Sequence, residues 1–280
     1  MTYAQASLLG VTYLEHGEPI ASYDIAALRA HAQALNGHAP TIGCVTFPAL
    51  DDFDNVLIIF AGNMERFFML SVARFARCKV VYFQDSASFW YQGSVLLPKL
   101  TDLGPFLAAQ TEGLRPVIFG QSSGGYAALL ASTHFEGAQA VACSPQTFCD
   151  KYFKARIHFS PKLNPQIAPD DLIDLKDYLP GRTSRNELTI ITAACELNNP
   201  YGSHFWVDHA HAFRMVDVEN LRIFMVAGSN HSLVFRRSMG FARLLEGLLG
   251  AASAPAEARL GIIGSFAAGI DEANTEKDWI

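Results

Sequence analysis

The sequence predicts an α/β fold in which helices cover both faces of one mostly parallel sheet. Short apolar runs alternate with helical patterns from about residue 55 onward, and this alternation is typical of parallel strands joined by helical crossovers. Apolar residues make up 50% of the 280 residues, which is enough to bury one large core. Chains of this length commonly form a single α/β domain, so we expect one domain over residues 1–280.

Six apolar runs have the length and composition of buried strands. They lie at residues 55–61, 79–83, 115–119, 138–143, 188–193 and 221–227. Helical patterns separate or follow them at residues 66–77, 96–113, 123–132, 203–216 and 233–249. Residues 144–187 depart from this rhythm with mixed apolar, proline and charged positions, and we interpret them as a small cap over the site.

The two ends of the chain have less regular patterns. Residues 8–14 and 42–47 are predicted to be antiparallel edge strands on either side of a helix at residues 25–35. An apolar segment at residues 260–270 fits either a docked helix or a surface for a partner. An oligomer formed through this C-terminal segment is therefore one expectation.

Composition and charge exclude several classes of partner. The formal net charge is −6 and the Lys and Arg residues are scattered, so no nucleic acid is expected to bind. No apolar run approaches the roughly 20 residues of a membrane span, and residues 1–10 lack the pattern of a secretory signal. We therefore expect a cytoplasmic protein. The five cysteines lack paired spacing, which favours neither a disulfide framework nor a zinc site.

Residues 120–125 read GQSSGG and place the pattern GxSxG between a strand and a helix. A strand that turns sharply into a helix holds the central serine, Ser122, in a strained conformation that needs small neighbours. The first amides of the helix favour the negative charge that develops in acyl transfer, so the Ser123 amide is a predicted oxyanion donor. A second donor is expected from Asn63 or Met64, which follow the strand at residues 55–61.

A serine hydroxyl needs a base to remove its proton, and His231 has the appropriate position. It follows the last strand and precedes the last main helix, in the chain order of serine, acid and histidine. The acid is expected in the loop after the penultimate strand, where Glu196 lies. Asp208 is the alternative acid, because a carboxylate there also falls between Ser122 and His231 in the chain.

Two other groups of residues have the chemistry of binding sites. Trp90 and Tyr91 follow a strand on the carboxyl side of the sheet, and we predict that they line the substrate pocket. Adjacent aromatic residues also pin loops to a core, which is the alternative. His204, Asp208 and His211 share one face of a predicted helix. No further ligand set matches them, so we interpret them as the polar face of that helix and expect no metal site.

The motifs GQSSGG, FAGN, CELN and GSNHS occur in an order that resembles the α/β-hydrolase superfamily, over residues 55–249. The resemblance implies a triad of Ser122, His231 and Glu196. It also implies oxyanion amides from Asn63 and Ser123, and no metal or organic cofactor. The sequence departs from the family in two places, since FAGN replaces the more usual HG pair and a glutamate replaces the commoner aspartate.

The resemblance implies a serine hydrolase that cleaves a carboxylic ester through an acyl-enzyme intermediate. Its substrate would be a small-molecule or glycan-linked acyl ester. Acyl transfer and thioester hydrolysis remain alternatives, because one triad serves all of these reactions. A catalytically degenerate accessory factor in glycan assembly is the alternative from another class.

Overall fold

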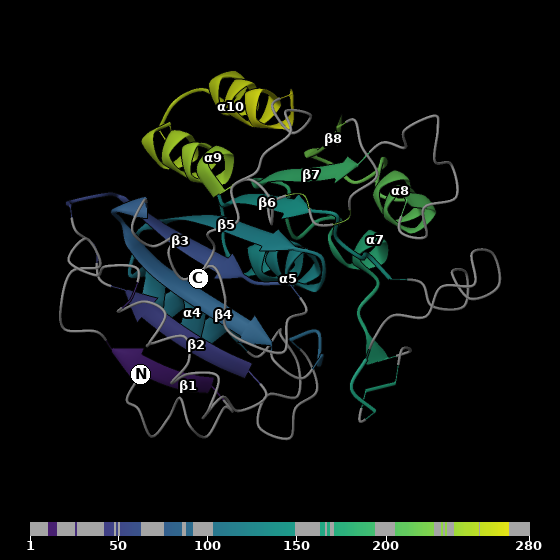
Figure 1. Ribbon diagram of the computed structural model, residues 1–280, viewed down its shortest axis with the longest axis horizontal. Coiled ribbons are helices and arrows are strands. Elements are labelled where there is room, and N and C mark those ends of the chain that lie inside the picture. The colour runs from purple at the N-terminus through teal and green to yellow at the C-terminus, as the bar shows by residue number, and fades with distance from the viewer. Residues whose placement is uncertain are drawn as a thin grey trace.

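Eight strands form one sheet through the middle of the molecule (Figure 1). In chain order they are β1 (Val11–Glu15), β2 (Ile42–Phe47), β3 (Asn55–Phe60), β4 (Lys79–Asp85), β5 (Arg115–Gln121), β6 (Gln139–Cys143), β7 (Glu187–Ala193) and β8 (Leu221–Val226). Their order in space is β1-β2-β4-β3-β5-β6-β7-β8. The computed structural model describes residues 11–15, 26, 42–47, 49, 51–62, 76–85, 88–91, 103–148, 163–165, 167–168, 171–193, 205–226, 231, 233, 238–251 and 253–268.

The six strands from β3 to β8 are parallel to one another and correspond to the six predicted apolar runs. Their ends differ from the prediction by at most two residues. At the edge, β2 runs antiparallel to β4 as expected, but β1 pairs parallel with β2. The chain between β1 and β2 is long enough for the crossover that a parallel pair requires. Most of the helix predicted at residues 25–35 lies outside the described residues.

The described α-helices are α4 (Gly104–Thr111), α5 (Ser123–Ala131), α7 (Leu175–Tyr178), α8 (Phe205–Phe213), α9 (Ser238–Gly250) and α10 (Ala256–Ala268). A 3-10 turn, η4 (Ser132–His134), extends α5. The helix predicted at residues 233–249 corresponds to α9, whereas Leu233 lies in a turn, where its amide donates to the His231 carbonyl. The helix predicted at residues 66–77 lies almost wholly outside the described part of the chain.

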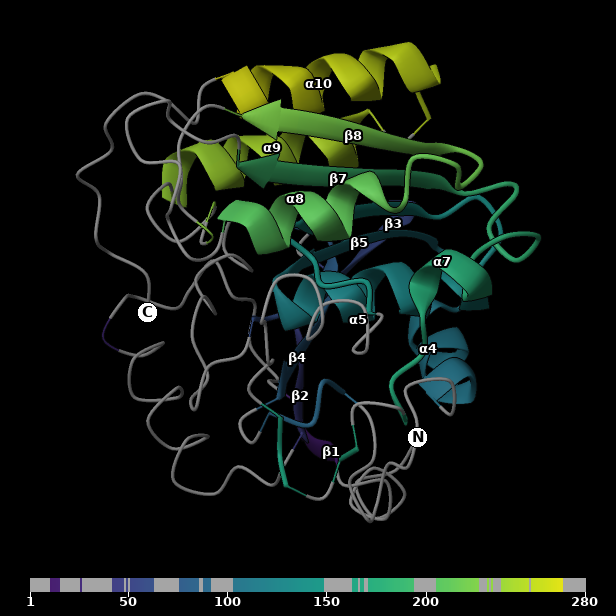
Figure 2. The ribbon, with the colours of Figure 1, turned by 90° about the vertical axis from the view of Figure 1, so that its right-hand side faces the viewer.

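Two apolar clusters, one on each face of the sheet, form the core. Successive strand residues point to opposite faces, so Val56 and Ile58 belong to one cluster while Leu57 and Ile59 belong to the other. The first cluster includes residues of α4, α5, α7 and α8, and the second includes residues of α9 and α10. Figure 2 shows α9 and α10 beside β8 and β7, with α4 and α5 on the other side of the sheet. This arrangement is the α/β-hydrolase fold that the sequence predicts.

The C-terminal apolar segment forms a docked helix. Ile263 and Phe266 of α10 are buried in the second cluster, against residues of α9. The two helices approach closely, since a Cβ added to Gly247 would lie 2.8 Å from the Ile262 side chain. Among the described residues, no helix combines the length and the apolar character needed to cross a membrane.

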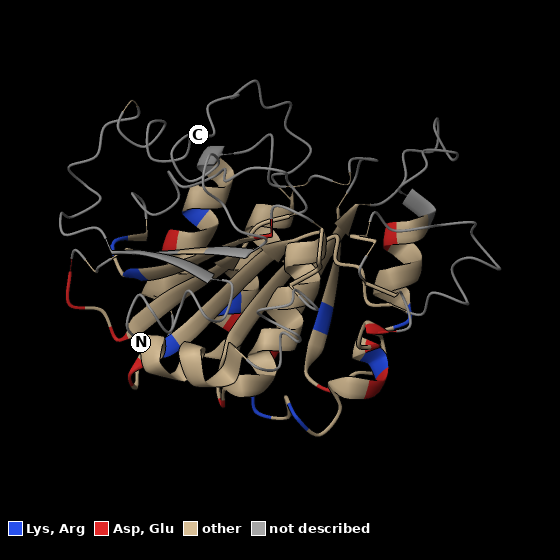
Figure 3. Ribbon diagram, turned by 90° about the horizontal axis from the view of Figure 1, so that it is seen from below, with Lys and Arg blue, Asp and Glu red and all other residues tan. Residues whose placement is uncertain are grey.

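Charged residues of both signs are distributed over the described elements. On the face seen from below, basic and acidic positions are interspersed along the helices, strands and turns (Figure 3). Part of the predicted cap is also described, and its helix α7 packs on the first cluster through Leu175. This part of residues 144–187 therefore shares a core with the central sheet.

Candidate active site

Ser122 lies at a sharp turn between β5 and α5. Its backbone has φ 58° and ψ −121°, a conformation with positive φ that a residue other than glycine rarely adopts. Gly120 and Gly124 are required for steric reasons. A Cβ on Gly120 would lie 2.0 Å from the Gly124 carbonyl oxygen. A Cβ on Gly124 would lie 2.0 Å from the Phe60 carbonyl oxygen. The turn thus packs backbone against backbone, as a nucleophile elbow requires.

Backbone hydrogen bonds tie the elbow to the neighbouring strand and to its own helix. The Ser122 amide donates to the Cys143 carbonyl at 2.8 Å, and the Tyr126 amide donates to the Ser122 carbonyl at 3.1 Å. Ser123, the predicted oxyanion donor, is buried and is the first residue of α5. Its place at the helix N-terminus is where free amides favour an anion.

The loop after β3 lies directly against the elbow. A Cβ on Gly62 would lie 3.1 Å from the Gln121 carbonyl oxygen and 3.8 Å from the Ser122 Cβ. The Gln84 carboxamide donates to the Gly62 carbonyl at 3.2 Å and so holds this loop from the side of β4. Asn63 and Met64, the candidates for the second oxyanion donor, lie outside the described residues.

The imidazole of His231 lies between Ser122 and a carboxylate. Its Nε2 is 2.9 Å from Ser122 Oγ, and its Nδ1 is 2.9 Å from both carboxylate oxygens of Asp208. Asp208 belongs to α8 and is only 2% exposed. A carboxylate beside Nδ1 favours the tautomer with its proton on Nδ1, so Nε2 carries no proton in that tautomer and can accept the one of the serine.

The carboxylate beside His231 is therefore the alternative acid of the sequence analysis, and Glu196 lies outside the described residues. The physical reason that Asp208 reaches the histidine is the docking of α8 on β7, which carries its carboxylate to the carboxyl edge of the sheet. The docking of a helix is a tertiary contact that the spacing of apolar runs does not reveal.

Gln146 is a site residue that the sequence analysis missed. It is buried in the loop after β6, and its Oε1 lies 3.4 Å from Ser122 Oγ. The same loop is anchored on both sides of Gln146, by the Ser144 amide on the Ile191 carbonyl and by the Thr147 amide on His211 Nδ1. Its place just beyond a strand at the carboxyl edge of the sheet is the one signal in the sequence that could have found it.

His211 is a buried histidine that supports the site from α8. Burial lowers its pKa well below the ordinary value, and the nearby charges of Arg214 and His231 lower it further. Its Nδ1 accepts the Thr147 amide at 2.8 Å, so that nitrogen carries no proton. Within the described part of the chain, no three His, Cys, Asp or Glu side chains are grouped as metal ligands. His204 lies outside it.

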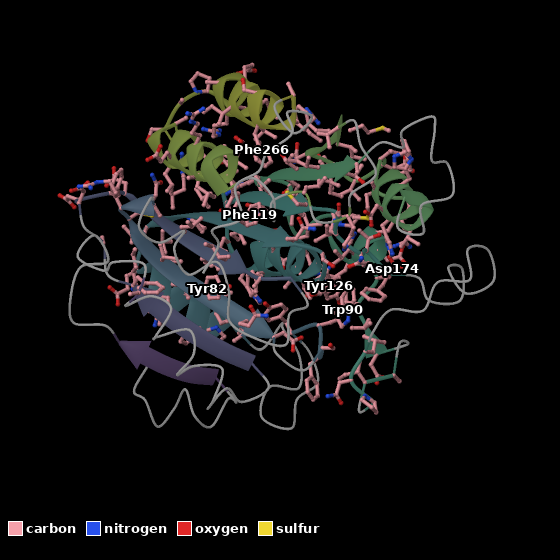
Figure 4. All side chains as sticks on the ribbon, viewed as in Figure 1. Tyr82, Trp90, Phe119, Tyr126, Asp174 and Phe266 are labelled. Carbon is pink, nitrogen blue, oxygen red and sulfur yellow. The ribbon has the colours of Figure 1, made fainter. Side chains whose placement is uncertain are left out.

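Trp90 and Tyr91, predicted to line the pocket, lie in the core instead. The Tyr91 hydroxyl is within hydrogen-bonding distance of the Ala61 and Phe83 carbonyls, at 2.9 and 3.1 Å. The ring of Trp90 makes an edge contact with Tyr126. Both residues are labelled in Figure 4. Both side chains are buried, because these contacts pin the loop after β4 to the sheet and to α5.

No family model and no curated protein matches the sequence. Solved structures are similar to it at low identity. MenH from S. aureus is 11% identical with a TM-score of 0.47, and the match covers 75% of this chain and 98% of that one. A monoacylglycerol lipase from Paleococcus ferrophilus is 13% identical with a TM-score of 0.45, covering 75% and 99%. The capsule O-acetyltransferase of Neisseria meningitidis is 12% identical with a TM-score of 0.46, covering 68% and 86%.

Proposed function

We propose that the protein is a serine hydrolase that cleaves carboxylic esters through an acyl-enzyme on Ser122. The observation that supports this most directly is the imidazole of His231, which lies 2.9 Å from the Ser122 hydroxyl on one side and 2.9 Å from the Asp208 carboxylate on the other. Such a chain of contacts activates a hydroxyl whose own acidity is too low for attack. The strained turn at Ser122 gives the proposal a second, independent support.

In the proposed reaction, Ser122 Oγ attacks the acyl carbon while His231 Nε2 takes the hydroxyl proton. The tetrahedral oxyanion is stabilised by the Ser123 amide at the start of α5, with Asn63 as the proposed second donor. His231 then gives its proton to the departing alcohol oxygen, and the acyl group stays on Ser122 as an ester. A water molecule then loses a proton to His231 and attacks the acyl carbon. As the bond to Ser122 Oγ breaks, His231 gives that proton to Oγ, and the carboxylic acid leaves.

We assign the role of the triad acid to Asp208 in place of Glu196. Its carboxylate is buried and has both oxygens at 2.9 Å from Nδ1, so it can orient the imidazole and stabilise its charged form. A degenerate accessory factor would leave the acid apart from the histidine, and the contact between Asp208 and His231 supports the catalytic alternative.

Labelling with a fluorophosphonate probe tests the nucleophile without knowledge of the substrate. The wild-type protein should be labelled and the Ser122→Ala variant should not, because the probe bonds to an activated serine oxygen. Equal labelling of the two proteins would refute the proposal. A panel of short and long acyl esters and thioesters then separates ester hydrolysis from thioester hydrolysis, and analysis of the products formed with an added alcohol acceptor separates hydrolysis from acyl transfer.

The acid is tested by a matched pair of amide substitutions. Asp208→Asn should lower the esterase kcat by about 10³- to 10⁴-fold, because an amide cannot keep the Nδ1 tautomer. Glu196→Gln should keep the wild-type rate. The reverse pattern would return the role to Glu196 while leaving Ser122 as nucleophile.

A further inference from the structure

Gln121, the residue before the nucleophile, connects β5 to the segment that carries the base. Its carboxamide Nε2 donates a hydrogen bond to the backbone carbonyl of His231 at 2.8 Å. Gln121 is only 7% exposed, so water does not compete freely for this contact. The bond joins two residues that lie 110 positions apart in the chain. Nucleophile and base are therefore linked through the backbone as well as through their side chains.

The direction of the Gln121 side chain follows from the alternation along β5. Val117 and Phe119 belong to the cluster that contains α9, and Gln121 continues the same every-second-residue row. His231, which follows β8 and precedes α9 in the chain, lies at this end of β5. A glutamine at this position is long enough to donate a hydrogen bond to the His231 backbone. An apolar residue of the same row could only pack against that backbone.

The contacts of the His231 carbonyl show what the carboxamide does. The carbonyl oxygen also accepts the Leu233 amide at 3.2 Å, and Leu233 is buried in the second cluster. The turn around His231 is thus held from one side by the core and from the other by the strand that leads into Ser122. Because the imidazole is attached to this turn, the bond from Gln121 helps to set the distance between Nε2 and Ser122 Oγ.

The carbonyl oxygen of the Gln121 carboxamide indicates that Gln121 does not mainly serve to stabilise the fold. Its Oε1 is buried and has no hydrogen-bond partner among the described residues. A buried oxygen left unpaired carries a desolvation cost, which offsets what the bonded amide contributes. A methionine of similar size would avoid that cost and fill the same space. The group that only glutamine supplies here is a donor aimed at the backbone of His231.

We propose that Gln121 is a positioning residue, which holds the His231 backbone so that its imidazole stays in register with Ser122. The proposal rests on the proposed function, in which His231 is the base for Ser122. Misplacement of a catalytic group by about 1 Å can lower a rate about 100-fold, so loss of this bond acts on the chemical step. The binding of a substrate or probe should be affected little.

The test uses the full-length protein and the rate of labelling by a fluorophosphonate, resolved into the maximal rate constant kinact and the half-saturating concentration KI. Gln121→Met removes the donor at nearly constant volume, and kinact should fall about 10- to 100-fold while KI stays within about twofold. Gln139→Met is the matched control. Gln139 is also a buried glutamine, 5% exposed, whose Oε1 has no partner in the part of the chain that the structure describes, but it lies at the start of β6. This control should label at the wild-type rate.

Gln121→Glu keeps the shape of the side chain and loses the donor when the carboxyl is ionised, so at alkaline pH it should be as slow as Gln121→Met. If Gln121→Met does not fold, Gln121→Glu still tests the positioning role. Wild-type kinact in both Gln121 variants, a rise in KI alone, or an equal loss in Gln139→Met would overturn the positioning role. Those outcomes leave Ser122 labelled in the wild type, whereas a wild-type protein that is not labelled at Ser122 would instead refute the proposed function.

Discussion

At the scale of single residues, the buried His211 makes the stability of the protein depend on pH. Its Nδ1 accepts a backbone amide, and burial together with the charges of Arg214 and His231 holds its pKa well below the ordinary value. In the unfolded chain the same side chain titrates near pH 6.5. At a pH between these two pKa values, His211 binds a proton in the unfolded state but not in the folded state.

We therefore predict that the free energy of unfolding falls as the pH is lowered below about 6.5, by up to about 1.4 kcal/mol per pH unit from this residue. The contribution of His211 is complete above the unfolded pKa and stops changing once the pH is below the folded pKa. The variant His211→Gln keeps an acceptor for the Thr147 amide and cannot titrate in this range. Urea unfolding over a pH series should give a shallower acid slope for the variant, and parallel slopes would contradict the prediction.

At the scale of elements, Arg214 joins three segments around the site. Its guanidinium forms a two-pronged contact with the Asp174 carboxylate at 2.7 and 2.6 Å, and it donates to the Thr147 carbonyl at 3.0 Å. It also donates to the Phe148 carbonyl. Asp174, labelled in Figure 4, caps α7 by accepting the Lys176 amide. One side chain after α8 thus fixes the loop that holds Gln146 and the start of α7.

Arg214→Ala is expected to lower the free energy of unfolding by about 2 kcal/mol or more, because the hydrogen bonds of a charged group to Asp174 and to the Phe148 carbonyl are lost. Arg185→Ala is the matched control. The Arg185 and Glu136 side chains form an ion pair that is 74% and 78% exposed, and such pairs contribute about 0–1 kcal/mol. Urea unfolding of both variants measures the difference. Similar losses for the two would show that the network around Arg214 adds no more than a surface pair.

At the scale of the whole molecule, α5 and α10 pack on opposite faces of the sheet. The first cluster includes α5 and part of α8, the helices beside Ser122 and Asp208, whereas α10 belongs to the second cluster with α9. Ile263 of α10 is buried there, and its apolar surface leaves water when the helix docks. The C-terminal helix therefore stabilises the sheet from the face opposite to α5.

Ile263→Ala should lower the free energy of unfolding by about 2–5 kcal/mol through the cavity that it leaves. Fluorophosphonate labelling of Ser122 should keep its wild-type rate, because α10 packs on the other side of the sheet. Gly261→Ala serves as the control in the same helix. A Cβ at Gly261 meets open space, so this change should raise stability by up to about 1 kcal/mol. A loss of labelling in folded Ile263→Ala would contradict the separation of the two faces.

The sequence by itself determined the strands β3–β8 and the elbow at Ser122, because both depend on local chemistry. A buried parallel strand requires an unbroken apolar run, and a turn in which an added Cβ would lie 2.0 Å from a carbonyl oxygen requires glycine at two fixed offsets from the serine. The fold class followed from the order of these segments. The candidate base was also predictable, since the order of serine, acid and histidine left His231 in a distinctive position after the last strand.

Only the tertiary structure decided which side chains surround the imidazole. Asp208 lies beside it because α8 docks on β7, and Gln121 bonds to its backbone because His231 lies at the end of β5. The burial of Trp90 and Tyr91 was likewise decided by packing, since an aromatic pair suits a pocket and a core equally well. Contacts between segments far apart in the chain depend on how whole elements pack, and no local spacing encodes that.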